Sequence, residues 1–293
     1  RVKRLRCSNE FYYCCKNRTS AVPPATTTFR PPTEKPRPNP ITCGRSPAGA
    51  SRVAEEFPWA IAIFERKRYA NSVYNFKCGG ALVHPRVVLT AQHCVRASTA
   101  NSIMITAGRE NVTQYSRTVL SRRVAKIIKH NQYNSGALYN DIALLILKSP
   151  LENTAPVCLP TPGQNFDRVR CVVAGWGSID QRTATTLRKL DLPVVDSQRC
   201  QFLLRRTALG AGFTLHPSFL CAGGEQDKDT CKGDGGSPLM CLENRRYVQI
   251  GIVSWGLECG QRDVPSMYTN VAQFSNWIEE VFEQENLVTS RYG

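Results

Sequence analysis

The chain has 293 residues, of which 42% are hydrophobic and 21% charged; this is ordinary globular usage and excludes a fibrous or wholly disordered chain. No run of about 18 or more apolar residues occurs, so the sequence predicts no membrane-spanning helix. Thirteen cysteines indicate an oxidising compartment, and because the number is odd, at least one is expected to pair outside this chain or to stay free. The net charge of +15 favours polyanionic partners without naming one.

The N-terminal part of the sequence differs in composition from the rest. Residues 1–45 hold ten Lys and Arg against two Glu, so they carry more than half of the net charge. Because the chain starts at Arg1 without an initiator methionine, we expect a processed or partial chain. Seven prolines and three consecutive threonines predict an extended linker over residues 21–42. Asn-X-Thr glycosylation acceptors begin at Asn17 and Asn111.

From Cys43 onward, short stretches rich in Val, Ile and aromatic residues alternate with Gly, Pro and Asn, which predicts an all-β fold, either a barrel or a sandwich. Apolar residues at helical spacing predict a C-terminal helix over residues 274–282. A shorter helix is expected over 196–206, with Asp196 or Ser197 as its N-cap. The strands are expected at 59–64, 81–90, 103–107, 142–147, 169–174, 248–253 and 267–271.

Three segments in chain order carry a resemblance to a known family. They are Leu89–Cys94, Asn140–Leu145 and Cys231–Leu239, and they resemble the motifs of the chymotrypsin-family serine proteases, whose catalytic residues occur in the order His, Asp, Ser. The resemblance begins at Cys43 and extends to the C-terminal helix, and it implies two six-stranded antiparallel β-barrels of the chymotrypsin/trypsin type with the active cleft between them. Supporting motifs stand at the expected intervals at 56–59, 174–177 and 254–256.

The resemblance places His93 as the general base and Asp141 as the acid that orients it, but Gly235 occupies the nucleophile position because the turn reads Gly-Asp-Gly-Gly-Ser-Pro. Ser237 lies two residues away, which displaces its Cα by roughly 6–7 Å. A base must reach its nucleophile at about 2.6–3.2 Å, so Ser237 is not expected to replace the missing serine. We therefore predict a pseudoprotease, not an enzyme; the alternative is an active trypsin-like endopeptidase that cleaves after Lys or Arg.

Other parts of the active site are implied by the same resemblance. Asp229 stands at the base of the primary specificity pocket, where an acid selects Lys or Arg, and the alternative is a solvated loop acid. The backbone N–H groups of Gly233 and Gly235 would form the oxyanion hole. Gln92 replaces the usual Ala beside the histidine, with no predicted consequence. The pocket walls are expected from Ser254, Trp255, Gly256 and Ser266, the last of which replaces a usual Gly and narrows the pocket.

Activation of such a zymogen requires a cut after a basic residue, and the resemblance places the junction at Arg45–Ser46. The new N-terminus would normally pair with the acid of the catalytic turn, here Asp234. Because Ser46 is polar and Pro47 is stiff, we expect cleavage to be feasible but that salt bridge to form poorly. Residues 109–117 lack the acids of the family's calcium loop, so we predict no metal, and no other cofactor is implied.

The cysteines divide into two groups. By resemblance, Cys7, Cys14 and Cys15 form the closing half of a clip domain over residues 1–20, and the alternative is an unrelated cysteine-rich segment. A linker over 21–42 and a trypsin-like (pseudo)protease domain over 43–293 would follow. The resemblance implies five disulfides in that domain: Cys43–Cys158, Cys78–Cys94, Cys171–Cys241, Cys200–Cys221 and Cys231–Cys259.

The altered turn resembles that of the arthropod clip-domain serine protease homologues. The resemblance implies a secreted, non-catalytic cofactor in an extracellular innate-immune cascade of the melanisation type, with cascade proteases, zymogens or prophenoloxidase as partners. The alternative is a pattern-recognition or adhesion protein that binds microbial surfaces. Nucleic acid is not expected as a partner, because the protein is expected outside the cell and shows no nucleic-acid-binding motif.

Basic residues in two segments of the domain suggest an exosite for a protein partner, a sulfated glycan or a bacterial polymer. Only Glu110 opposes the second segment in sequence. The alternative is a scattered, solvated surface. The expected members are Arg66, Lys67, Arg68, Arg117, Arg122, Arg123, Lys126 and Lys129.

Overall fold

The computed structural model describes residues 43–66, 73–114, 119–177, 185–230, 233–257 and 259–287. No helix within these ranges is long and apolar enough to cross a membrane. The predicted clip-like segment and linker lie outside the described residues. So do several individual predictions: Cys7, Cys14, Cys15, Asn17, Lys67, Arg68, Arg117 and Cys231.

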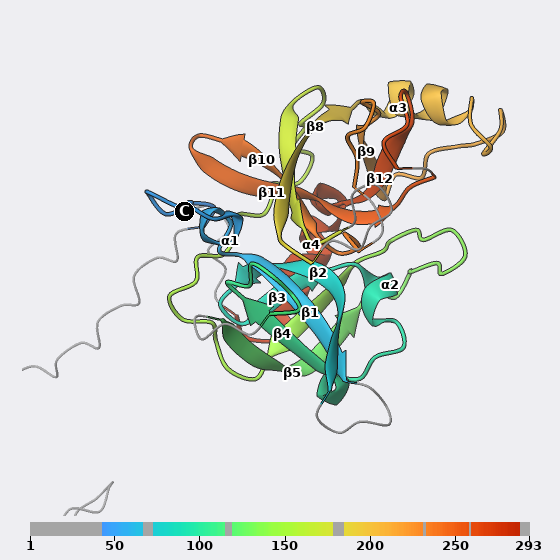
Figure 1. Ribbon diagram of the computed structural model, residues 1–293. Helices are drawn as coiled ribbons and strands as arrows, with labels where there is room; N and C mark the ends of the chain where they lie inside the picture. Colours follow the sequence, from blue (N-terminus) through green and yellow to red (C-terminus); the bar gives the residue numbers. More distant parts are fainter. Residues whose placement is uncertain are drawn as a thin grey trace, which may run out of the picture. The chain divides into compact units, whose positions relative to one another are not determined.

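The first six strands close into one antiparallel barrel (Figure 1), with neighbours in the order β1-β2-β3-β6-β5-β4. Their side chains, together with those of the C-terminal helix, fill the largest hydrophobic core of the described chain. The strands are β1 (Ala60–Arg66), β2 (Tyr74–His84), β3 (Val87–Thr90), β4 (Ile103–Ala107), β5 (Leu120–Lys129) and β6 (Ala143–Leu147).

The last six strands form a second closed antiparallel barrel in the order β10-β11-β12-β9-β8-β7. The predicted architecture of two six-stranded barrels is therefore confirmed. The strands are β7 (Arg170–Gly175), β8 (Arg188–Val195), β9 (Phe219–Gly223), β10 (Pro238–Glu243), β11 (Arg246–Trp255) and β12 (Pro265–Asn270).

Both predicted helices are confirmed. The N-cap of α3 (Ser197–Leu204) is Asp196, whose carboxylate accepts a hydrogen bond from the Arg199 N–H at 2.8 Å. The apolar face of α4 (Ser275–Gln284) is buried against the first barrel, because its buried residues join that barrel's core cluster. The remaining helical elements are short: α1 (Val53–Glu56), α2 (Gln92–Val95) and the 3-10 turns η1 (Ala100–Ser102) and η2 (Val271–Phe274).

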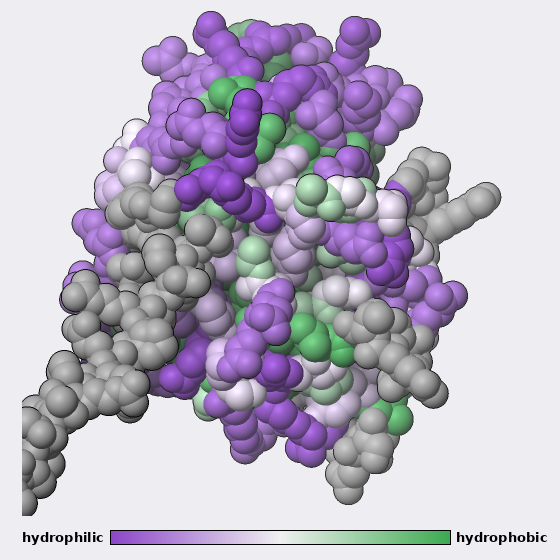
Figure 2. Space-filling view, turned by 90° about the vertical axis from the view of Figure 1, so that its left-hand side faces the viewer, coloured by the Kyte–Doolittle hydropathy of each residue, from purple (hydrophilic) through white to green (hydrophobic). Residues whose placement is uncertain are grey.

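Strands β5, β8, β9 and β10 were not among the expected stretches, and β5 is the clearest case, because its composition hides it. Only Val124 is buried among its ten residues, and four are Arg or Lys, so the alternation that marks a half-buried strand is absent. The single stretch expected over 81–90 is two strands, β2 and β3, joined by a turn at Pro85 and Arg86. The visible face in Figure 2 is mainly hydrophilic, with smaller hydrophobic areas between.

Candidate pseudo-active site

The predicted base and its orienting acid meet in the structure. His93 lies on α2, directly after β3, and Asp141 precedes β6. The His93 Nδ1 is 2.6 Å from the Asp141 Oδ2, and the backbone N–H of His93 donates to Oδ1 at 2.7 Å. Because both carboxylate oxygens are used, the orientation of the imidazole is fixed. Asp141 is fully buried, whereas the His93 side chain keeps 29% of its exposure.

Asp141 also receives two hydrogen bonds from the second barrel. The Ser254 hydroxyl, on β11, donates to Oδ2 at 2.7 Å, and the Thr269 hydroxyl, on β12, donates to the backbone carbonyl of Asp141 at 2.8 Å. Sequence reasoning placed Ser254 in the pocket wall and did not consider Thr269. This buried acid therefore joins the two barrels in addition to orienting the imidazole.

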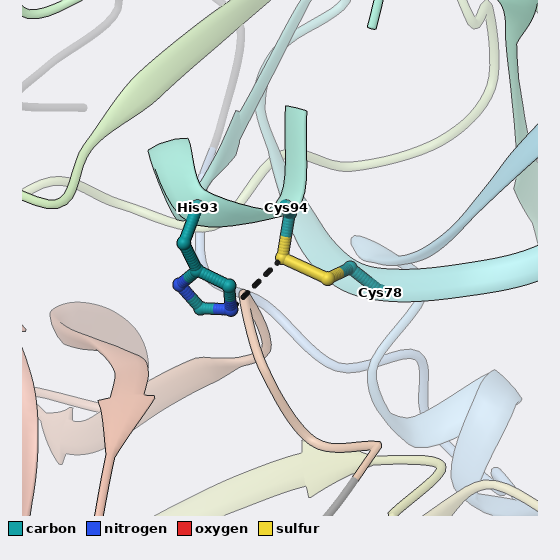
Figure 3. Close-up of side chains that lie close together, drawn as sticks. All are labelled: Cys78, His93 and Cys94. Atoms are coloured by element: carbon teal, nitrogen blue, oxygen red, sulfur yellow. Dashed lines mark hydrogen bonds between the residues drawn. A yellow bond between two sulfur atoms is a disulfide. The ribbon is translucent and has the colours of Figure 1, made fainter. Parts of the chain in front are cut away.

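The imidazole fills the space next to Gly235, where a nucleophile would stand. A Cβ placed on Gly235 would lie 2.9 Å from the His93 Nε2, which is shorter than the non-bonded distances that Cβ atoms keep in proteins. The same Nε2 atom of His93 is 3.5 Å from the Cys94 sulfur (Figure 3), and Cys94 forms a disulfide with Cys78. Because the two sulfurs are joined in a disulfide, this cluster offers no thiolate for a metal. A serine at position 235 would require the ring to move.

Ser237, the other hydroxyl of the turn, is directed into the core. It is fully buried, and its Oγ has no hydrogen-bond partner among the described residues. The Oγ packs on Gly79 and Gly175, and a Cβ on Gly175 would come within 3.0 Å of it. The hydroxyl therefore makes no hydrogen bond to His93.

Backbone hydrogen bonds to both barrels hold the turn in place. The Gly79 N–H, on β2, donates to the carbonyl of Gly235, and the Gly236 N–H donates to the carbonyl of Val253, on β11, both at 2.9 Å. Gly236 has φ of +81°, and a Cβ there would overlap the Gly79 carbonyl, so only glycine fits. Gly233, also at positive φ, and Gly235 are the expected oxyanion-hole donors, and that role stays a prediction.

Asp229, the expected base of the specificity pocket, lies under Ser266. Its carboxylate accepts hydrogen bonds from the Thr230 N–H at 2.7 Å and the Gly260 N–H at 3.2 Å, and from the Ser266 side chain. Burial raises the pKa of Asp229 to about 6 despite these donors. A Cβ on Gly256 would be 2.8 Å from the Ser266 Oγ, so this hydroxyl fills space between Gly256 and the acid. A Lys or Arg side chain that reached this carboxylate would therefore compete with the Ser266 hydroxyl for it.

The predicted activation junction is accessible. Arg45 is exposed, and the Ser46 hydroxyl donates to the carbonyl of Glu56 at 2.6 Å. Asp234 is buried and accepts the Gly177 N–H at 2.7 Å. Cleavage after Arg45 stays a prediction.

The Arg109 side chain organises the start of the segment where the sequence predicts no metal. The Arg109 guanidinium donates to the carbonyls of Val112 and Gln114 at 3.3 and 3.0 Å and lies 5.0 Å from the centre of the Phe64 ring. Burial lowers the pKa of Arg109. The carbonyls of Val112 and Gln114 therefore accept hydrogen bonds from a cationic side chain of the same loop.

The glycosylation acceptor Asn111 is engaged with a second loop. Its Nδ2, the atom that would carry a glycan, donates to the hydroxyls of Thr185 and Thr186 at 3.1 and 3.3 Å. Its Oδ1 accepts from the N–H of Thr113 at 2.9 Å. A glycan at this nitrogen would replace at least one of these bonds.

The described members of the basic exosite lie along β5 and the end of β1. The Arg123 guanidinium donates to the Tyr74 hydroxyl at 2.6 Å, and Tyr74 is the cross-strand partner of Arg66. Lys126 is paired with Glu285 at 2.6 Å, an acid that sequence reasoning overlooked. Glu110, the acid expected to oppose this cluster, instead accepts the backbone N–H of Ala54. We call Arg66, Arg122, Arg123, Lys126 and Lys129 the β5 basic strip.

Four of the implied disulfides are present, and Cys259, whose expected partner Cys231 lies outside the described residues, is disulfide-bonded. The four described bridges are Cys43–Cys158, Cys78–Cys94, Cys171–Cys241 and Cys200–Cys221.

Gln92, for which the sequence predicted no consequence, makes a hydrogen bond in the structure. Its Oε1 accepts the backbone N–H of His130 at 2.7 Å, which fixes the loop after β5.

Comparisons with known proteins agree with this geometry. The model of the Trypsin family matches residues 47–278. The chain is 41% identical over 245 residues to phenoloxidase-activating factor 2 of Galleria mellonella, covering 77% of this chain and 80% of that protein. It is 36% identical over 296 residues to inactive CLIP domain-containing serine protease A28 of Anopheles gambiae, covering 94% and 77%. It is 38% identical over 300 residues to inactive CLIP domain-containing serine protease A8 of Anopheles gambiae, covering 94% and 79%.

The two barrels and the matched family model define the class: the chain belongs to the trypsin family. Within that family it is a clip-domain serine protease homologue, and it is non-catalytic, as the names of its relatives and the glycine at the nucleophile position agree.

Proposed function

We propose that this protein is a secreted, non-catalytic cofactor of an extracellular immune protease cascade of the melanisation type, which acts by binding cascade proteases, zymogens or prophenoloxidase. One observation carries the proposal: the His93 ring lies in the space beside Gly235, and the nearby Ser237 hydroxyl is buried away from it. A protein that keeps the two barrels of a protease but lacks the catalytic nucleophile can still bind other proteins through its surface. The name of the Galleria mellonella relative, a phenoloxidase-activating factor, supports this type of cascade.

Secretion is supported by the disulfides. Four bridges lie within the described residues, and disulfides of this kind persist in oxidising compartments outside the cytosol. Cleavage after the exposed Arg45 is the step by which we propose that the cascade acts on this protein.

The proposal can be tested by adding the purified chain to arthropod plasma from which it has been immunodepleted. We expect the chain to restore phenoloxidase activation after a microbial stimulus, and to do so without labelling by a fluorophosphonate probe. A variant with Arg45→Gln, which blocks the proposed cut, should restore less activity. Equal activation in depleted plasma with and without the chain would contradict the cofactor role, and fluorophosphonate labelling of the chain would contradict its non-catalytic nature.

The β5 basic strip favours a second candidate function, binding to anionic glycans or microbial polymers. Arg66 and Arg123 share one face through Tyr74, and Arg123, Lys126 and Lys129 are all exposed. Several cations on one strand attract a polyanion more strongly than scattered charges do.

This candidate is tested by heparin chromatography of a variant with Arg66, Arg122 and Arg123 changed to Glu. We expect it to elute at a clearly lower salt concentration than the parent chain. Because three reversals change the net charge, the control reverses three exposed basic residues of the second barrel, away from the strip: Arg245, Arg262 and Lys228. Equal shifts for the two variants would mean that net charge, rather than the strip, controls retention. Pull-down on peptidoglycan, lipopolysaccharide and β-glucan then identifies the class of polymer.

A further inference from the structure

An exposed aromatic ring on α3 stands between Arg199 of the same helix and Arg206 of the turn that follows it. The Phe202 side chain is 52% exposed, although large apolar side chains are usually covered. The guanidinium carbons of Arg199 and Arg206 lie 5.5 and 5.7 Å from the centre of its ring. These are cation–π distances, so each guanidinium group is attracted to the face of the Phe202 ring. Neither the predicted site nor the β5 basic strip includes these residues.

A shallow hollow of about 740 Å³ adjoins this ring. Phe202 forms one side, and the partly buried Pro193 and Val195 contribute apolar surface from the end of β8. Arg168 stands on its rim with 86% of its side chain exposed. The hollow therefore combines an apolar lining with a basic rim. It belongs to the second barrel, at the end of the molecule opposite β5 in Figure 1.

The positive charge around the hollow exceeds the negative charge. Four arginines lie on or beside α3 and its neighbouring loop, against the three carboxylates of Asp167, Asp196 and Asp263. Asp196 already caps the helix by accepting the Arg199 N–H. The ion pairs Arg168–Asp196 and Arg199–Asp263 are both 3.8 Å long, so the guanidinium groups retain capacity for an anionic partner. The four arginines are Arg168, Arg199, Arg205 and Arg206.

We propose that this α3 face, defined by Arg168, Arg199, Phe202 and Arg206, is a docking surface for a protein segment in which acidic residues flank an apolar side chain. The apolar side chain would cover Phe202 and enter the hollow, and the carboxylates would pair with the arginines. The proposal goes beyond the cofactor function, because it concerns the chemistry of the contact whatever the partner does.

A protein segment fits this surface better than a polyanionic glycan. Aromatic residues and arginines are enriched at the centres of protein interfaces, where burial of the ring supplies much of the affinity. A sulfated glycan would use the arginines but would leave Phe202 and the apolar lining uncovered. The dependence of binding on Phe202 therefore separates the two classes of partner.

The test uses direct binding in solution with the full chain. The probe is a fluorescein-labelled peptide of about 12 residues in which a central Phe is flanked by Asp and Glu on both sides. Two companion peptides replace the Phe with Ala or the acids with Lys. We expect only the first peptide to bind the parent chain appreciably, with Phe202→Ala weakening binding about tenfold or more. The double reversal Arg199→Glu and Arg206→Glu should abolish it.

Matched controls come from the hairpin between β10 and β11. Leu242→Ala removes another exposed apolar side chain, 59% exposed, and Arg245→Glu reverses another exposed charge in the same barrel. Both should bind the peptide like the parent, and thermal unfolding should show that every variant is folded. The proposal is overturned if the parent does not bind the peptide at millimolar concentration, if Phe202→Ala binds as the parent does, or if the Ala peptide or heparin binds this face independently of Phe202. None of these outcomes depends on the plasma assay.

Discussion

The two barrels contribute to the pseudo-active site in different ways. The first barrel keeps the hydrogen bonds between His93 and Asp141 at 2.6 and 2.7 Å, whereas the turn from the second barrel has Gly235 beside the imidazole and a hydroxyl buried in the core. The difference indicates why the His93–Asp141 pair is kept although the nucleophile is absent. The carboxylate of Asp141 also accepts a hydrogen bond from Ser254 of the second barrel, and its backbone carbonyl accepts one from Thr269, so this position keeps structural contacts even where no reaction takes place. An intact dyad is therefore poor evidence of catalysis.

The largest effect is expected from removing the acid that joins the barrels. Asp141→Ala leaves the His93 N–H and the Ser254 hydroxyl without their buried acceptor, so we expect unfolding to become easier by about 3 kcal/mol or more. Equilibrium urea unfolding with intact disulfides measures this. His93→Ala, which removes a partly exposed side chain, should cost much less. Equal losses for the two variants would mean that Asp141 matters only as the partner of the imidazole.

Two buried serines sharpen the contrast between paired and unpaired hydroxyls. Ser254→Ala removes a donor to the buried carboxylate and should cost about 1–3 kcal/mol of unfolding free energy. Ser237→Ala removes a hydroxyl with no described partner and should be neutral or stabilising by up to about 1 kcal/mol. Thermal or urea unfolding of both variants gives the comparison. A marked loss of stability in Ser237→Ala would reveal that its hydroxyl has a partner after all.

Asp229 makes the second barrel sensitive to pH. Its pKa is about 6 in the folded chain, raised by burial from the ordinary 3.8, so the folded state holds the proton more tightly than the unfolded state. This contribution to stability is fully present below the ordinary pKa of 3.8 and is lost as the pH rises through about 6. Relative to Asp229→Asn, the parent should therefore lose melting temperature between about pH 4 and about pH 7. A constant difference in melting temperature across this range would contradict the raised pKa.

The smallest effect is expected from restoring the family turn. Gly235→Ser combined with Ser237→Gly supplies a hydroxyl, but the His93 ring is too close to the new Cβ and the Ser266 hydroxyl still covers Asp229. We expect hydrolysis of an arginyl amide substrate to stay close to the background of the parent. A follow-up variant adds Ser266→Gly, because this change removes the hydroxyl that is hydrogen-bonded to Asp229. Efficient turnover by the first variant would show that the glycine alone silences this fold.

Much of this molecule could be predicted from its sequence, because the informative residues are local. The motifs around His93 and Asp141 and the apolar spacing of the last helix indicated the fold correctly. Four strands, β5, β8, β9 and β10, were not among the expected stretches. In β5 the charged residues hide the alternation, and the strand is defined by its pairing with β4 and β6. The links from Thr269 to Asp141 and from Gln92 to His130 join residues far apart in the chain, and no local pattern predicts such pairs.

The α3 face is an intermediate case. Arg199 and Phe202 are three residues apart, and Arg206 follows four residues later, a spacing that places them on one side of a helical segment. This signal was present in the sequence. What the sequence could not provide was the exposure of the ring and the hollow beside it, because both depend on how α3 packs on the barrel.

The bridge between Cys43 and Cys158 has a consequence for any cut after Arg45. It spans 115 residues of sequence, and Gly44 is further anchored by its N–H to the carbonyl of Pro156 and by its own carbonyl, which accepts the N–H of Tyr247. A cleaved molecule would therefore keep its mass until it is reduced, when it would separate into two chains. Residues 1–42 would remain tethered to the barrels, so a partner bound by one part would encounter the other at a high effective concentration.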